Sequence, residues 1–311
     1  MFRMLRQVHF KNLRNPSPSG LFFILEKIME NVKLNDGATI PAIGFGVFLV
    51  PDDGTCEKAV SEALKIGYRF IDTAAAYMNE VGVGKAIAKS GIKREEIYIT
   101  SKLWLQDYGY EAAKKGIDRS LKNLNVDYID LYLLHQPYFD TIGAWKALEE
   151  AIAVGKIKSI GISNHTIGFL EKLLPHMNIK PAINQMECNP LFQQKELRKF
   201  MAPHDIKMQA WYPLGHGSKE LFNNEILKLI AQKHGKSVSQ IILRWHIEEG
   251  IIPIPKSTSP AHIKENFEIF DFKLDDDDMR KIRAIDKGVG SHNPDDLSFS
   301  ETLLKNYKIH D

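Results

Sequence analysis

The stretch YRFIDTAAAY, residues 68–77, joins an apolar run to a carboxylate, a small-residue loop and a phenol. An apolar run that closes in this way predicts a buried strand and the loop that follows it. Two later apolar runs end similarly, one in Lys102 and one in His135. Barrel enzymes carry their chemistry at the carboxyl ends of strands. The sequence therefore predicts one proton-transfer site that combines Asp72, Tyr77, Lys102 and His135.

The neighbouring segments repeat this strand-to-helix pattern over roughly 250 residues, the length of one (β/α)8 barrel. Eight strands are predicted, at 43–48, 70–73, 97–101, 129–134, 157–162, 182–186, 207–211 and 251–254. Helices are predicted at 56–66, 80–90, 111–124, 144–154, 167–174, 194–201, 225–234, 238–249, 260–267 and 275–285. The strands are continuous apolar runs, as expected for parallel strands buried on both faces.

A doubly wound sheet is the alternative to the barrel. It requires a G-x-G-x-x-G phosphate loop after the first strand, and Gly44-Phe45-Gly46 has no third glycine after it. Asn35-Asp36-Gly37 lies between two short alternating runs and predicts a hairpin at 31–41. The predicted fold is thus an α/β (TIM) barrel with an N-terminal β-hairpin and a C-terminal helix and tail.

The first 28 residues differ from the rest of the chain. Residues 1–15 are basic and contain no acidic residue, and the apolar run at 21–25 is too short to span a bilayer. We interpret residues 1–28 as an upstream extension or a misassigned start, and expect them to be disordered. An organelle-targeting segment is the alternative, because the stretch is rich in Arg and poor in acid. Residues 29–311 are expected to form a single domain.

Composition narrows the class of protein. The chain has 311 residues, 44% of them hydrophobic, and a formal net charge of +2. A nearly balanced charge without a basic stripe argues against nucleic-acid binding. Cys56 and Cys188 lie far apart and fit a reducing cytoplasm better than a disulfide framework or a zinc site. The acidic run 275–278 suits a helix start better than a metal site. We expect a cytoplasmic protein without metal or membrane attachment.

Seven motifs are shared with a known family, and on them the chain resembles the aldo-keto reductases, most closely bacterial members similar to 2,5-diketo-D-gluconate reductases. The motifs are GFGVF at 44–48, GYRFIDTA at 67–74, TSKLW at 100–104, DLYLLH at 130–135, GISN at 161–164, INQ at 183–185 and PKS at 255–257. The resemblance runs from about residue 32 to about residue 286. It implies a barrel enzyme that reduces aldehydes and ketones with a nicotinamide cofactor, NADPH.

The chemistry of the four predicted residues agrees with that activity. Carbonyl reduction needs a hydride, which no side chain supplies, and a proton donor within hydrogen-bond reach of the oxygen. Tyr77 is the predicted donor, and a nearby Lys102 ammonium is expected to lower its pKa. Asp72 would hold Lys102, and His135 would orient the carbonyl. Each residue taken alone has an ordinary structural role, and it is their order at successive strand ends that favours catalysis.

The resemblance also implies a set of cofactor-binding residues. Trp211 would stack on the nicotinamide ring, and Ser163, Asn164 and Gln185 would bind its carboxamide. Lys256 and Ser257 follow the eighth strand, where barrels often bind phosphate. The full set expected to contact the cofactor is Val47, Phe48, Asp72, Ser163, Asn164, Gln185, Trp211, Leu214, Lys256, Ser257, Thr258, His262, Glu265 and Asn266.

Two positions depart from the family pattern. His262 occupies a place where many relatives have an Arg that clamps the 2′-phosphate, and neutral His cannot make that bidentate contact. We therefore expect NADPH use with weakened preference, and NADH use as well. Gln136 stands where relatives commonly have Trp, which makes the substrate pocket more polar. The expected substrate-binding residues are Phe48, Tyr77, Trp104, His135 and Gln136. A small polar carbonyl such as a sugar-derived ketone, methylglyoxal or an aromatic aldehyde would fit them.

Two other functions stay open at this stage. The same fold could serve as a non-catalytic, nucleotide-binding regulatory subunit. A metal-dependent barrel hydrolase is the second alternative, although no HxH or carboxylate-histidine pair follows a predicted strand. The partner of the protein is expected to be a small-molecule carbonyl compound, and the chain is expected to be a monomer. The sequence does not place the tail after Asp286, including Ser291, His292 and Phe299.

Overall fold

The computed structural model describes residues 30–310, so the predicted extension at 1–28 lies outside the described residues. Eight parallel strands follow one another around the centre of the molecule, in the order β10-β9-β8-β7-β6-β5-β4-β3. Their bounds are β3 Phe45–Gly46, β4 Phe70–Asp72, β5 Tyr98–Leu103, β6 Ile129–Leu134, β7 Ile157–Ser163, β8 Ile183–Glu187, β9 Lys207–Trp211 and β10 Ile252–Pro253. All eight predicted strands are present, most of them within one or two residues of the predicted bounds.

The first and last strands close the barrel through two backbone hydrogen bonds. Gly44 N donates to Pro253 O, and Gly46 N donates to Pro255 O, both at 3.0 Å. Glycine is required for this close approach. A Cβ at Gly44 would lie 2.5 Å from the ring of Phe70, and one at Gly46 would lie 3.0 Å from the Ile254 carbonyl oxygen. The glycines of the GFG motif thus serve barrel closure, and the predicted (β/α)8 fold is confirmed.

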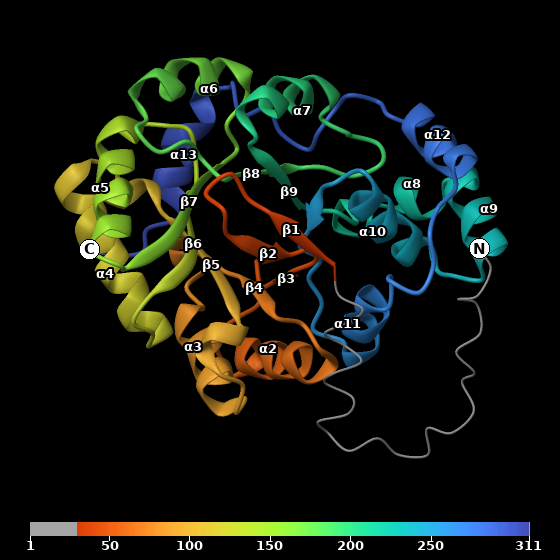
Figure 1. Ribbon diagram of the computed structural model, residues 1–311, viewed down its shortest axis with the longest axis horizontal. Coiled ribbons are helices and arrows are strands. Elements are labelled where there is room, and N and C mark those ends of the chain that lie inside the picture. The colour runs from red at the N-terminus through yellow and green to blue at the C-terminus, as the bar shows by residue number, and fades with distance from the viewer. Residues whose placement is uncertain (1–29, 311) are drawn as a thin grey trace, which may run out of the picture.

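Helices surround the sheet (Figure 1). Ten of them correspond to predicted helices: α2 Thr55–Ile66, α3 Glu80–Lys89, α4 Tyr110–Leu124, α5 Thr141–Ala153, α6 Ile167–Leu173, α7 Lys195–Met201, α9 Glu225–His234, α10 Val238–Glu248, α11 Pro260–Phe267 and α12 Asp276–Ala284. The acidic run starts α12 as expected, because the Asp275 carboxylate accepts from Asp278 N in a capping box. Sequence patterns missed two helices, the single-turn α8 Lys219–Phe222 and α13 Ser298–Asn306 in the tail.

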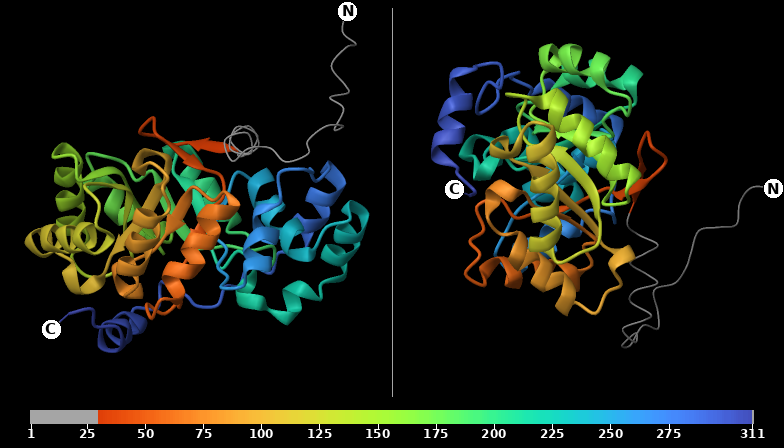
Figure 2. Two further views of the ribbon diagram at one scale, coloured as in Figure 1. Left: turned by 90° about the horizontal axis from the view of Figure 1, so that it is seen from below. Right: turned by 90° about the vertical axis from the view of Figure 1, so that its left-hand side faces the viewer.

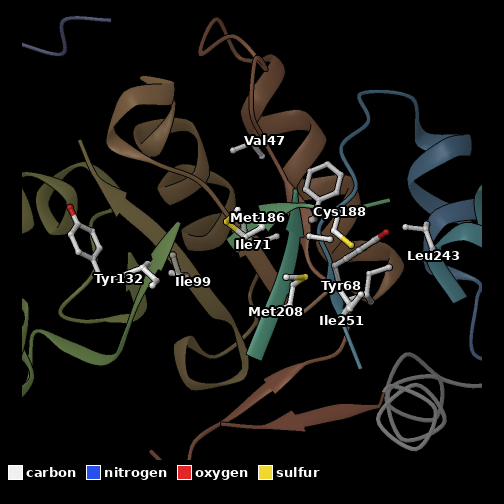
Figure 3. Packing of buried hydrophobic residues seen from close by; sticks show 14 of the residues in the cluster. Val47, Tyr68, Ile71, Ile99, Tyr132, Met186, Cys188, Met208, Leu243 and Ile251 are labelled. Carbon is white, nitrogen blue, oxygen red and sulfur yellow. The ribbon is translucent and has the colours of Figure 1, made fainter. Parts of the chain in front are cut away.

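The core has two parts because successive strand residues face opposite sides of the sheet. Ile71, Tyr132 and Met208 belong to a large cluster between the sheet and the helices, which also includes Leu243 of α10 (Figure 3). Alternate residues such as Phe70 and Leu131 join a second cluster. The hairpin strands β1 Asn31–Lys33 and β2 Thr39–Pro41 flank Leu34 and contribute Ile40 to this second cluster, so the hairpin covers one end of the barrel.

The hairpin and α13 lie at opposite ends of the barrel (Figure 2). The carboxyl ends of the parallel strands therefore open toward α13 and the tail rather than toward the hairpin. Within residues 30–310, the helices are too short or too polar for any of them to cross a membrane.

Candidate active site

A cavity of about 870 Å³ lies at the carboxyl ends of the strands. Most of the predicted site residues line it together: Phe48, Asp72, Tyr77, Trp104, His135, Gln136, Ser163, Asn164, Gln185, Trp211, Leu214, Lys256, Ser257, His262, Glu265 and Asn266. Lys102 lies beneath this surface with its side chain fully buried. Val47, which is buried in the core, and Thr258, which is exposed, are not among the lining residues.

The Lys102 ammonium connects the predicted acid to its charge partner. Its Nζ donates to Asp72 Oδ1 at 2.6 Å, to Thr73 O at 2.9 Å and to the Tyr77 hydroxyl at 3.2 Å. These three acceptors use all three protons of an ammonium group. Lys102 is therefore fixed in place, and the phenol of Tyr77 lies where a proton can leave toward the cavity.

The electrostatics of this group differ from the sequence argument in one respect. Burial raises the pKa of Tyr77 well above its usual range, and the charge of Asp72 raises it further. Burial also raises the pKa of Asp72 and lowers that of Lys102, while their mutual attraction opposes both shifts. The expected lowering of the Tyr77 pKa by Lys102 does not appear in this geometry, because removal of the phenolate from water is the largest cause of the shift and raises the pKa. The phenol stays protonated at neutral pH.

His135 faces Tyr77 from the end of β6. The two rings meet edge to face with centroids 5.5 Å apart, and Trp104 lies 5.0 Å from the imidazole on another side. Burial lowers the pKa of His135 well below 6.5, and the Lys102 charge adds to the shift. The imidazole is therefore neutral. It can orient a carbonyl by hydrogen bonding, while Tyr77 holds the transferable proton.

A pair of buried amides holds the second oxygen of Asp72. Gln185 Nε2 donates to Asp72 Oδ2 at 2.7 Å and also to Gln209 Oε1. Both protons of the Gln185 amide are thus used inside the protein, which leaves its carbonyl oxygen for a ligand. Sequence reasoning missed Gln209, which is fully buried. The available signal was a polar residue inside an apolar strand, on the same face as Trp211.

The side chains expected to bind a carboxamide also bind one another. Asn164 Nδ2 donates to His135 O at 3.1 Å, and Trp211 Nε1 donates to Asn164 Oδ1 at 3.0 Å. Ser163 Oγ donates to Gln185 O at 2.9 Å. Asn164 is therefore hydrogen-bonded to groups at the carboxyl ends of both β6 and β9. These bonds fix the rim on which Trp211 presents its indole ring to the cavity.

The far end of the cavity is built for an anion. Lys256 is exposed at the rim, next to Ser257 and just before α11. Pro260 occupies the first turn of α11, and the capping residue Ser259 makes no side-chain bond to the helix. The first backbone N–H groups of this helix are thus left for a negatively charged ligand. His262 is exposed on the same turn.

The tail closes one side of the cavity, through residues that the sequence did not place. Trp104 Nε1 donates to Tyr307 O at 2.6 Å, and Leu303 of α13 packs in the cluster of Trp104. His292 stacks on Trp211 with ring centroids 5.5 Å apart. Tyr307, Leu303 and His292 all line the cavity. No local motif marks these contacts, since the partners lie more than eighty positions apart in the chain.

Comparison with known proteins identifies the family of the fold and the site. The protein-family model described as "Aldo/keto reductase family" matches residues 42–287 of this chain. Glyoxal reductase of Bacillus subtilis (strain 168) is 47% identical over 278 residues, covering 88% of this chain and 99% of that protein. Methylglyoxal reductase DkgA of Escherichia coli (strain K12) is 42% identical over 260 residues, covering 83% of this chain and 94% of that protein. The crystal structure of a Gox0644 mutant in complex with NADPH has a TM-score of 0.82 at 38% identity, covering 86% of this chain and 98% of that one.

Proposed function

Because the chain belongs to the aldo/keto reductase family, we propose that it reduces small aldehydes and ketones to alcohols with NADPH, with Tyr77 as the proton donor. One observation carries the proposal. Lys102 Nζ lies within hydrogen-bond distance of both Asp72 and the Tyr77 hydroxyl, beneath the cavity that His135 and Trp104 also line.

The protein's own groups can perform the proton transfer. A substrate oxygen bound between the Tyr77 hydroxyl and the His135 imidazole receives a hydrogen bond from each. As negative charge develops on that oxygen, Tyr77 donates its proton, and the phenolate that remains accepts a hydrogen bond from the Lys102 ammonium. Asp72 keeps the ammonium in place. The raised pKa of Tyr77 suits reduction, because the phenol is in its protonated form before each turnover.

The cavity fits a dinucleotide cofactor that carries phosphates. NADPH, when bound, supplies the hydride. Lys256, Ser257 and the first turn of α11 would hold its 2′-phosphate, and Glu265 and Asn266 would contact the adenine. Trp211 would stack on the nicotinamide, and the Gln185 carbonyl would accept from its carboxamide. With His262 in place of a clamping Arg, NADH is a second usable cofactor.

Small α-dicarbonyl compounds, methylglyoxal and glyoxal, are the substrates that we propose. Gln136 lines the cavity beside His135, and its Oε1 has no hydrogen-bond partner among residues 30–310. The Gln136 backbone is held on both sides by the Tyr108 hydroxyl, which donates to Gln136 O at 2.7 Å and accepts from Gln136 N at 3.0 Å. The side chain therefore lies at the cavity wall, where its Nε2–H group, rather than Oε1, would donate to the second oxygen of a dicarbonyl compound. The names of the two relatives support the same substrate class.

A matched pair of variants tests the proposal. Wild-type protein should oxidise NADPH in the presence of methylglyoxal, and Tyr77→Phe should lose about 10² to 10⁴ of kcat while it still binds NADPH. Tyr110→Phe, which removes a hydroxyl at the exposed contact with Glu150, is the control and should retain full activity. Unchanged turnover in Tyr77→Phe would reject Tyr77 as the donor. NADPH binding without reduction of any aldehyde or ketone would instead favour the regulatory-subunit alternative.

A further inference from the structure

A second cavity, of about 390 Å³, adjoins the active site at the loops that follow β6 and β7. Its walls come from the loop after β6, from α6 and from the tail around Leu297 and Ser300. The two cavities have no lining residue in common, although neighbouring residues of the same loops line them. Gln136 and Asn164 line the first, and the next residues in the chain, Pro137 and His165, line the second. Its volume lies within the range of small-molecule sites.

The walls of the second cavity are mainly aromatic and aliphatic. Tyr138 and Phe169 meet edge to face with centroids 5.9 Å apart, and His165 lies 6.2 Å from Phe169. Phe139 and Leu297 also line the cavity and are 53% and 62% exposed, so large apolar side chains face water at this site. Phe139 also has a φ of 62°, a left-handed conformation that costs free energy in a non-glycine residue. This surface is not explained by packing within residues 30–310.

His165 gives the cavity one specific polar group. The side chain is buried, and its Nδ1 lies 2.8 Å from Ser163 O. A carbonyl oxygen can only accept, so Nδ1 carries the proton. Burial lowers the pKa of His165 to about 4, which keeps the ring neutral at neutral pH. Nε2 is therefore an acceptor, and it has no partner among the described residues. A buried acceptor without a donor costs about 1–3 kcal/mol, and a ligand with one hydroxyl would remove that cost.

We propose that this cavity binds a small neutral aryl alcohol, with its ring against the side chains of Tyr138 and Phe169 and its hydroxyl donating to His165 Nε2. The site does not depend on the reductase activity proposed above, because its residues are separate from those that would transfer the proton. It lies next to the tail, since the Tyr138 hydroxyl donates to Pro294 O at 2.8 Å. A ligand that contacts Tyr138 thereby reaches the segment that also closes the active site.

Two probes of the same shape test the hydrogen bond in the wild-type protein. Titration calorimetry on the full chain, saturated with NADPH, compares p-cresol with toluene, which has the same ring and methyl group but no hydroxyl. We expect p-cresol to bind at least tenfold more tightly. Equal affinities, or no binding of p-cresol at millimolar concentration, would overturn the proposal. Because this comparison needs no variant, it stands even if substitutions at His165 impair folding.

Variants then locate the probe. His165→Phe keeps an aromatic ring but removes the acceptor, and should reduce the affinity for p-cresol to that for toluene. Lys172→Gln, at the exposed rim, should leave the affinity unchanged because a neutral phenol needs no cation. Phe48→Ala alters the active-site cavity, lines no part of the second one and should also leave the affinity unchanged. Loss of p-cresol binding in Phe48→Ala but not in His165→Phe would place the probe in the active site and refute the proposal.

Discussion

Acidification should lower the folding stability of this protein, and the size of the loss can be calculated from two buried histidines. His165 and His246 have side chains that water scarcely reaches, and burial lowers the pKa of each from 6.5 to about 4. Nδ1 of His165 faces the Ser163 carbonyl, and the two nitrogens of His246 face those of Ile242 and Cys188. The two carbonyls at His246 favour its protonated form, but burial outweighs them and the pKa is lowered. Neither ring can take up a proton in the folded protein until the pH approaches its lowered pKa.

The sign and the size follow from proton linkage. Below pH 6.5 the unfolded chain binds protons at these positions and the folded chain does not, so stability falls as the pH falls. The pKa of each histidine is 6.5 in the unfolded chain and about 4 in the folded protein. Each one therefore lowers the free energy of unfolding by about 2 kcal/mol when the pH falls from 7 to 5. The stability that depends on the neutral histidines is fully present above pH 6.5, and it falls no further below about pH 4. The two histidines together should cost about 4 kcal/mol at pH 5.

Urea unfolding at pH 7 and pH 5 measures this loss, and a neutral replacement isolates one histidine. In His246→Gln the difference between the two pH values should be smaller by about 2 kcal/mol than in wild type. The matched control is His176→Gln, which removes an exposed imidazole and should follow the wild-type profile. An identical pH dependence in wild type and His246→Gln would refute the argument, because it would mean that His246 binds protons equally in both states.

Four further predictions concern the active site. The kcat/KM for reduction should be constant between about pH 6 and pH 8, because His135 stays neutral and Tyr77 stays protonated across that range; a titration near pH 6.5 in the profile would contradict this. Gln209→Leu removes an acceptor from the amide pair that holds the catalytic carboxylate and should lower kcat about tenfold with KM nearly unchanged, as steady-state kinetics would show. His262→Arg should raise the preference for NADPH over NADH about tenfold, measured as a ratio of kcat/KM values. Gln136→Leu should lower kcat/KM for methylglyoxal about tenfold and leave that for propanal unchanged; equal losses for both substrates would remove Gln136 from dicarbonyl recognition.

The barrel and the convergence of its polar residues could be predicted because both depend on local patterns. Apolar runs mark the strands, and a polar residue at the end of each run must lie at the same rim when the strands are parallel. This is why Asp72, Lys102 and His135 were expected together and are found around one cavity wall. The GFG motif was useful in another way: its missing third glycine excluded a phosphate loop, and the structure shows that its glycines permit barrel closure.

The features that sequence reasoning missed depend on contacts between distant residues or on burial. The pKa of Tyr77 is one case, since the charge partner was identified correctly but the cost of burying a phenolate cannot be estimated without the surrounding walls. Gln209 is another, because its importance arises only when β8 and β9 pair in register and bring it against Gln185. The helix α13 has an ordinary amphipathic pattern, but nothing local indicates that it would pack beside Trp104.

Trp211 has a position that the sequence predicted and a contact with the tail that it did not. Its place at the end of β9 was predicted from the strand pattern, and a stacking role was expected from the resemblance. In the structure His292 already stacks on the indole, with an interplanar angle of 24°. An indole has two faces, and the edge that carries Nε1 is held by Asn164, so the ring cannot turn freely to offer a new surface. In the stacking role that we propose for Trp211, a nicotinamide ring would have to use the face opposite His292 or displace His292 and the tail with it. In the first case the tail would support the cofactor through the indole, and in the second it would have to move before the cofactor could bind. On this proposal, cofactor binding and the position of the tail are linked through one side chain.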